Sequence, residues 1–185
     1  LMGAGASVQE ARQVVREAFG DELVSDDGAN LEQVVVDLLA KKGRTLAIAE
    51  SCTGGLIASR VTDVPGSSEV FRYGFVTYAN EAKEELLGVN PDALRNHGAV
   101  SEQVARQMAE GALTAGKADL GVAVTGIAGP AGGSEEKPVG TVFLGLAEKG
   151  RETRVFKQFH PWARAAFKRQ VSQAALNLVR LTLGK

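Results

Sequence analysis

Cysteine is almost missing from this 185-residue sequence, because Cys52 is the only one. A single thiol cannot form an internal disulfide, which is typical of a reducing compartment. The two histidines, His97 and His160, lack metal-ligand spacing to each other, and one cysteine does not supply a zinc-binding set. We therefore expect chemistry that needs neither a metal ion nor a cofactor.

Long apolar runs and an excess of one charge are also missing. The sequence has no stretch of about 18 apolar residues and no basic N-terminal segment followed by an apolar core, so it predicts neither a membrane span nor a secretory signal. Lys and Arg number 21 and Asp and Glu 22, for a net charge of -1. Non-specific nucleic-acid binding requires an excess of basic residues. We expect a soluble, cytoplasmic protein without membrane or nucleic-acid partners.

Apolar residues, by contrast, make up 44% of the chain, enough for one domain with a real core. Apolar periodicity and helix caps predict helices over residues 7–19, 31–42, 54–64, 80–87, 91–96, 101–117 and 162–183, with Asn80 and Ser101 as caps. Short apolar or β-branched runs predict strands over residues 44–49, 71–78 and 120–124, then a hairpin of 139–147 and 151–159. Helices alternating with strands before a closing antiparallel pair predict an α/β fold, with helices on both faces of a mixed sheet.

Residues 1–30 differ from the remainder of the chain. The helical pattern over 7–19 is amphipathic, and residues 21–30 mix acidic residues, Ser and Gly as linkers do. We expect residues 1–30 to be a helix and linker, with the main domain over residues 31–185. The first helix would then belong to an interface or to a preceding domain.

The stretch Glu50-Ser51-Cys52-Thr53-Gly54-Gly55 lies between an apolar strand pattern and a helical pattern. A sharp strand-to-helix turn leaves backbone N–H groups unpaired at the helix start, where a phosphate or an oxyanion can bind, and Ser51 sits where a nucleophile would be presented. The alternative is that Ser51 or Thr53 caps the helix while Gly54 and Gly55 only permit the turn. Spacing alone leaves both interpretations open.

A second glycine-rich stretch, residues 126–138, is too long for a tight turn. Long ordered loops in small domains are more often functional than idle. Gly126 and Gly129 would let backbone N–H groups approach a substrate, or they would simply shape the end of the strand.

Five motifs in order resemble the CinA C-terminal domain family, from about residue 31 to the C-terminus. They are Glu-Ser-Cys-Thr-Gly-Gly (50–55), Gly-Phe-Val-Thr-Tyr with Asn-Glu-Ala-Lys (74–83), His-Gly-Ala-Val-Ser (97–101), Thr-Gly-Ile-Ala-Gly-Pro (125–130) and Glu-Glu-Lys-Pro-Val-Gly-Thr-Val (135–142). The resemblance implies a three-layer α/β/α sandwich. It also implies amidohydrolase activity on nicotinamide mononucleotide, giving nicotinate mononucleotide and ammonia in pyridine nucleotide salvage. Residues 7–30 resemble the tract that precedes this domain in longer CinA proteins, where it joins an N-terminal domain.

Residue by residue, the resemblance implies that Ser51 is the nucleophile and that Tyr78 and Lys83 are the other catalytic side chains. A serine hydroxyl needs a neighbouring base, which a lysine can supply when its pKa is lowered. Without the resemblance, Lys83 reads as a solvated residue among acidic neighbours, and Tyr78 as a strand aromatic. Cys52 is an alternative nucleophile, although neither histidine is near it in sequence and a buried core thiol is the commoner case.

The remaining expectations concern the substrate. Backbone N–H groups at Thr53, Gly54 and Gly55, or at Gly126, would hold an oxyanion. Lys137 and Arg164 are candidates for phosphate recognition, against an alternative in which both are ordinary exposed charges. Arg164 follows Trp-Ala here, where the family has Gly-Asp.

Two other function classes remain open at this stage. The first is a non-catalytic nucleotide-binding or regulatory module that uses the same glycine turns for phosphate. The second is an assembly domain whose first helix mediates oligomers. We expect a homo-oligomer that binds a small nucleotide.

Overall fold

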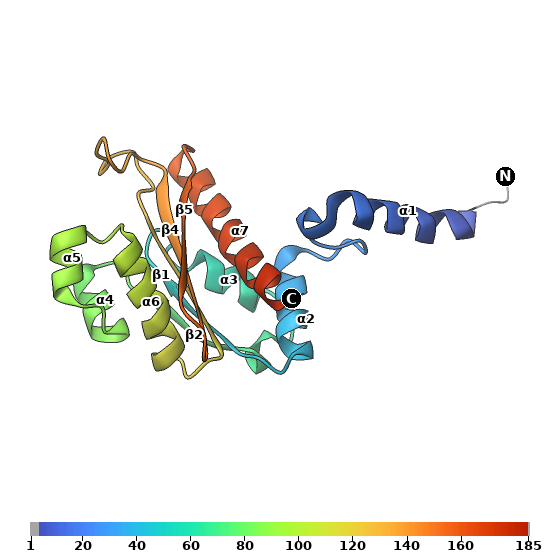
Figure 1. Cartoon of the computed structure of the whole chain (residues 1–185), viewed down its shortest axis with the longest axis horizontal. Helices are drawn as coiled ribbons and strands as arrows, with labels where there is room; N and C mark the ends of the chain where they lie inside the picture. The colour runs from blue at the N-terminus through green and yellow to red at the C-terminus, as the bar shows by residue number, and fades with distance from the viewer. Residues whose placement is uncertain (1–3, 185) are drawn as a thin grey trace.

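The computed structural model describes residues 4–184 and is built around a five-stranded mixed sheet (Figure 1). The strands are β1 (Leu46–Glu50), β2 (Phe71–Val76), β3 (Leu120–Gly126), β4 (Thr141–Glu148) and β5 (Arg154–Phe159), in the order β2-β1-β3-β4-β5. β1 runs parallel to both of its neighbours, while β4 pairs antiparallel with β3 and with β5. The carboxyl ends of β1, β2 and β3 therefore meet at one edge of the sheet, where ligands bind in open α/β folds.

Helices cover both faces of the sheet, which confirms the expected three-layer α/β/α arrangement. One face packs against α2 (Leu31–Lys41), α3 (Leu56–Thr62) and α7 (Arg164–Leu183). The other packs against α4 (Asn80–Leu87), α5 (Pro91–His97) and α6 (Glu102–Ala115). Two short 3-10 helices, Gly20–Glu22 and Ser67–Glu69, complete the described elements.

The two faces of the sheet carry side chains of different size. Leu46 and Ile48 of β1 lie in the core with α2, α3 and α7, whereas Ala47 and Ala49 lie in the core with α4, α5 and α6. The small-residue face lets α6 approach closely: a Cβ added to Gly121 would lie 2.3 Å from the carbonyl oxygen of Ala109. Close packing of this kind fixes α6 against β3 and β4.

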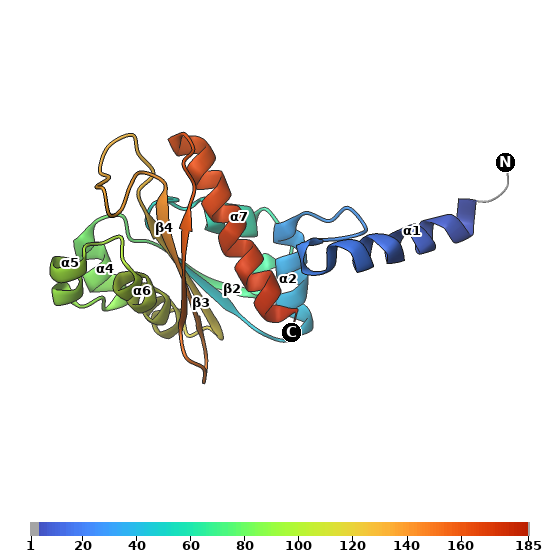
Figure 2. The same ribbon diagram turned by 45° about the horizontal axis from the view of Figure 1, so that its top comes forward.

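α1 (Ala4–Phe19) confirms the expected first helix and extends away from the body of the domain in both views (Figures 1 and 2). Its apolar side chains include Val14 and Phe19, which are 63% and 55% exposed. Arg180 of α7 donates a 3.1 Å hydrogen bond to the carbonyl oxygen of Leu23 and so ties the following linker to the domain. None of the helices in residues 4–184 has both the length and the apolar character that a bilayer crossing demands.

Two expected helix caps have different outcomes. Ser101 does cap α6, because its Oγ accepts a 3.3 Å hydrogen bond from the N–H of Val104. Asn80 does not cap α4: the cap position belongs to Ala79, which has no side-chain cap bond. The carbonyl oxygens before this helix instead accept hydrogen bonds from Lys83, whose ammonium reaches back past the helix start.

Candidate active site

Ser51 lies at the carboxyl edge of the sheet, between the ends of β2 and β3. Its N–H donates a 3.0 Å hydrogen bond to the carbonyl oxygen of Val124, and the N–H of Thr77 donates a 2.9 Å bond to the carbonyl oxygen of Glu50. The chain then turns through Gly54 and Gly55, whose φ angles of 61° and 93° lie in the left-handed region that favours glycine. Ser51 itself is half-buried and makes no side-chain hydrogen bond within residues 4–184.

The N-cap residue of α3 is Gly55, which makes no side-chain cap bond, and the side chain of Glu50 caps the helix in place of Ser51 or Thr53. The Glu50 side chain is 1% exposed, and its carboxylate accepts hydrogen bonds from the N–H groups of Gly55 (3.0 Å), Ile57 (3.1 Å) and Ala58 (2.8 Å). A buried carboxylate requires such donors, and the first turn of a helix supplies both N–H groups and a favourable dipole. The start of α3 is thus already occupied by an anion from the chain itself.

This cap narrows the choice of oxyanion donors at the turn. The expectation that the Gly55 N–H would hold an oxyanion is corrected, because that group donates to Glu50. The Gly54 N–H donates a 3.2 Å bond to the carbonyl oxygen of Ser51. The Thr53 hydroxyl is fully buried and has no hydrogen-bond partner within the described residues.

Lys83 is buried, and the interpretation of it as a solvated helix residue is wrong. Its side chain is 1% exposed, and its Nζ donates to the carbonyl oxygens of Thr77 (2.8 Å), Tyr78 (3.3 Å) and Ala79 (3.3 Å). Burial lowers the pKa of Lys83 from its ordinary value, while Cys52 and Glu81 act in the opposite direction. The sequence held a signal for this burial, because Lys83 precedes the buried Leu87 by one helical turn.

Tyr78, Arg164 and Gly129 come together from three distant parts of the chain. Arg164 Nη2 donates a 2.8 Å hydrogen bond to the Tyr78 hydroxyl, and Arg164 Nη1 donates a 3.0 Å bond to the carbonyl oxygen of Gly129. The ring of Tyr78 is accessible, with the residue 61% exposed. The first turn of α7 therefore joins the β2–α4 junction to the glycine-rich loop.

Lys137 lies elsewhere. Its Nζ donates a 2.8 Å hydrogen bond to the carbonyl oxygen of His97, at the end of α5. The Thr125 hydroxyl makes a similar 2.8 Å bond to the carbonyl oxygen of Ala99. These contacts attach the glycine-rich loop and the end of β3 to the α5–α6 connection, and they give Lys137 a structural partner. Gly126 is needed for packing, since a Cβ there would lie 2.9 Å from the carbonyl oxygen of Thr141.

Sequence reasoning missed one cation beside the turn. The Nζ of Lys168 lies 3.6 Å from the position that a Cβ on Gly54 would occupy. Lys168 is half-buried and follows Arg164 by one turn of α7. Its spacing from Arg164 is the signal that could have found it, because residues four apart on a helix share a face.

Cys52 has the properties of a core thiol. It is 5% exposed, and burial raises its pKa to about 12. A thiol with such a pKa carries almost no thiolate at neutral pH, and the thiolate is the nucleophilic form. The environment of the turn therefore favours Ser51 over Cys52 as the attacking group.

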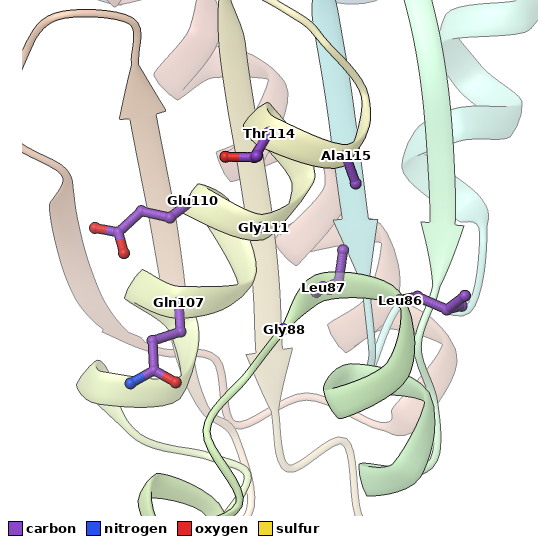
Figure 3. A pocket seen from close by; sticks show the side chains of 8 residues that line it. All are labelled: Leu86, Leu87, Gly88, Gln107, Glu110, Gly111, Thr114 and Ala115. Atoms are coloured by element: carbon purple, nitrogen blue, oxygen red, sulfur yellow. The ribbon is translucent and has the colours of Figure 1, made fainter.

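One hollow in the surface lies apart from all of these residues. It has a volume of about 410 Å³ and is lined by residues from the end of α4 and from α6 (Figure 3). Gly111 makes the closest approach there, since a Cβ on it would lie 2.1 Å from the carbonyl oxygen of Leu87. Figure 3 shows Leu86, from α4, and Glu110, from α6, on opposite sides of this hollow. The hollow is a feature of helix packing and contains none of the expected site residues.

Sequence comparisons relate the chain to proteins of one family. A family model described as the CinA C-terminal domain matches residues 28–183. A CinA-like protein of Akkermansia muciniphila is 51% identical over 176 residues, covering 95% of this chain and 42% of that protein. A CinA-like protein of an Anaeromyxobacter species is 49% identical over 183 residues, covering 98% of this chain and 44% of that protein. The chain spans less than half the length of these relatives.

Solved structures agree with the sequence comparisons. The crystal structure of the competence/damage inducible protein CihA from Agrobacterium tumefaciens matches with a TM-score of 0.80 at 40% identity, covering 85% of this chain and 97% of that one. A CinA superfamily protein from Escherichia coli matches with a TM-score of 0.79 at 31% identity, covering 88% and 98%. Both carry the same fold as the domain described above.

Proposed function

The chain belongs to the CinA C-terminal domain family, and from this premise we propose that it is an amidohydrolase acting on nicotinamide mononucleotide. The reaction would convert the pyridine carboxamide to a carboxylate, giving nicotinate mononucleotide and ammonia. The proposed nucleophile is Ser51, and the proposed setting is pyridine nucleotide salvage.

The observation that carries this proposal is the burial of Lys83. Its ammonium lies at the end of β2, and β2 pairs with β1, the strand that leads into Ser51. The 1% exposure of Lys83 and its lowered pKa increase the neutral fraction that a general base requires. Its Nζ now donates to three carbonyl oxygens, two of them at 3.3 Å. A neutral amine has only two N–H groups, so release of one long bond would free the lone pair to accept a proton.

The proposed steps follow acyl-transfer chemistry. Ser51 Oγ attacks the carboxamide carbon while its proton passes to Lys83, and in this proposal Tyr78 relays the proton or orients the nucleophile. Collapse of the tetrahedral intermediate breaks the C–N bond, and the nitrogen leaves as ammonia after taking that proton. Water then adds to the acyl-enzyme and breaks the ester, which releases the carboxylate and restores Ser51.

Groups near Ser51 would hold the negative charge of the intermediate. With the Gly55 N–H used by Glu50, the candidates are N–H groups of the turn before Gly54 and those of the glycine-rich loop. Donors fixed by the fold stabilise an oxyanion without reorganising during the reaction.

Incubation of the purified chain with nicotinamide mononucleotide, followed by assay of ammonia and of the acidic nucleotide, tests the proposal. Equal amounts of both products that depend on Ser51 would support it. A nucleotide-binding module would instead show a nucleotide-dependent rise in melting temperature without ammonia. That result would replace the amidohydrolase proposal with the binding-module alternative.

A further inference from the structure

Two cations, Arg164 and Lys168, lie one turn apart on the same face of α7. Arg164 reaches Tyr78 and Gly129, and Lys168, one helical turn later, reaches Gly54. Together they lie against the three segments of the candidate active site: the β1–α3 turn, the β2–α4 junction and the glycine-rich loop.

Neither cation is neutralised by the protein. The six ion pairs within residues 4–184 include neither Arg164 nor Lys168. Arg164 donates to a phenol and to a backbone carbonyl, which are both uncharged. The acid closest in sequence to the turn is Glu50, and its carboxylate already accepts three backbone N–H groups. Two cations without an acidic partner at the edge of the candidate active site favour the binding of an anion there.

We infer that Lys168 is a substrate-binding residue and that, with Arg164, it binds the phosphate of a nucleotide monophosphate. This inference rests on the proposed function, and it replaces Lys137 as the second phosphate cation. The ammonium of Lys137 donates to the carbonyl oxygen of His97, whereas the Lys168 ammonium has no hydrogen-bond acceptor within the described residues and lies beside Gly54. Lys168 thereby makes the site selective for the phosphorylated nucleotide over the nucleoside.

The kinetic test compares nicotinamide mononucleotide with nicotinamide riboside, the same molecule without its phosphate. Lys168→Met should raise KM for the mononucleotide by about tenfold or more and leave kcat within about threefold, because ground-state and transition-state binding are lost together. The variant should leave kcat/KM for the riboside unchanged. Lys168→Arg should restore the mononucleotide KM to within about threefold of wild type.

The matched control is Arg169→Met, since Arg169 is an exposed cation at the next position of α7. It should change neither parameter for either substrate. The inference would be overturned by a Lys168→Met variant that has a lower kcat at unchanged KM, or by one whose kcat/KM falls by the same factor for the mononucleotide and the riboside.

A second measurement separates this inference from the proposed function. Calorimetric titration of wild type and Lys168→Met with inorganic phosphate requires no turnover. Weaker phosphate binding in Lys168→Met would support the anion site even if the wild type released no ammonia, in which case only the amidohydrolase proposal would fail. Equal binding by both proteins, or no binding by the wild type, would overturn the anion site.

Discussion

Arg164 and Tyr78 are joined by a 2.8 Å hydrogen bond although 86 residues separate them in the sequence. The guanidinium Nη2 donates and the phenol oxygen accepts, so the hydroxyl proton of Tyr78 remains free to point at another acceptor. Because Tyr78 is 61% exposed, a substrate can approach the same hydroxyl. Through this bond Arg164, an expected phosphate-binding residue, orients the side chain of Tyr78, an expected catalytic residue.

We expect Tyr78→Phe to lower kcat for ammonia release by about a hundredfold or more, because a positioned proton-transfer group contributes about 10²–10⁴-fold. The free energy of unfolding should change by less than about 1 kcal/mol, since the hydroxyl bond lies at an exposed position. The control is Tyr73→Phe, which alters the chain's other tyrosine, itself 54% exposed on β2. Full activity of Tyr78→Phe would remove Tyr78 from the proton path.

Ser51→Ala should abolish ammonia release, because loss of a covalent nucleophile costs several orders of magnitude in rate. Substrate binding, measured by calorimetry with nicotinamide mononucleotide, should survive. The companion variant Cys52→Ala should stay close to wild type in rate, since burial holds the pKa of that thiol at about 12. If Cys52→Ala were the inactive variant and Ser51→Ala the active one, the two assignments would be exchanged.

Lys83→Arg should reduce the rate at least about a hundredfold, because a guanidinium with a pKa above ~12 cannot accept the serine proton. Burial lowers the pKa of Lys83 below its ordinary 10.5, so the wild-type rate should rise with pH through that lowered value. The rate of the Lys83→Arg variant should not show this rise with pH. Lys149→Arg, at an exposed turn position, serves as the control.

Arginine is bulkier than the buried lysine, so Lys83→Met provides a second test at similar side-chain volume. It should be equally inactive while its circular dichroism stays native.

In the wild type, the native state releases the Lys83 proton at a lower pH than the unfolded chain does. The free energy of unfolding should therefore gain a positive contribution from Lys83 as pH rises from the lowered pKa to about 10.5. Near-wild-type turnover by both variants would show that the proton goes elsewhere.

Gly121→Ala should destabilise the fold by about 3 kcal/mol, since overpacking a tight core contact costs ~1–3 kcal/mol or more. The new Cβ would lie 2.3 Å from the carbonyl oxygen of Ala109 and 2.7 Å from the backbone nitrogen of Leu113, and neither atom can move without shifting α6. Gly184→Ala is the control, because its nearest atom would be 3.4 Å away. Urea denaturation measures both, and equal stability of the two variants would contradict the close packing of α6 on β3.

Local sequence patterns determined most of the elements. The periodicity of residues 31–42 and the Ser101 cap lie within one or two helical turns, so neighbouring residues carry the whole signal, and the structure has both features. The strands and the closing hairpin were likewise specified by composition and turn residues over short segments. The element order already predicted helices on both faces of a mixed sheet, and the family resemblance, carried by five separate motifs, identified this arrangement with the three-layer fold of the solved structures.

Tertiary structure alone decided how the site residues are used. The side chain of Glu50 caps α3 because a buried carboxylate needs hydrogen-bond donors, and the N–H groups of Gly55, Ile57 and Ala58 at the start of that helix supply them. The spacing of Lys83 from Leu87 was a local signal for burial and its acidic neighbours were a signal for solvation, and the packing of this face of α4 on the core decided between them. Arg164 meets Tyr78 only because α7 returns to the edge of the sheet where β2 ends. Burial and contacts of this kind depend on segments far apart along the chain, which a local pattern of residues does not contain.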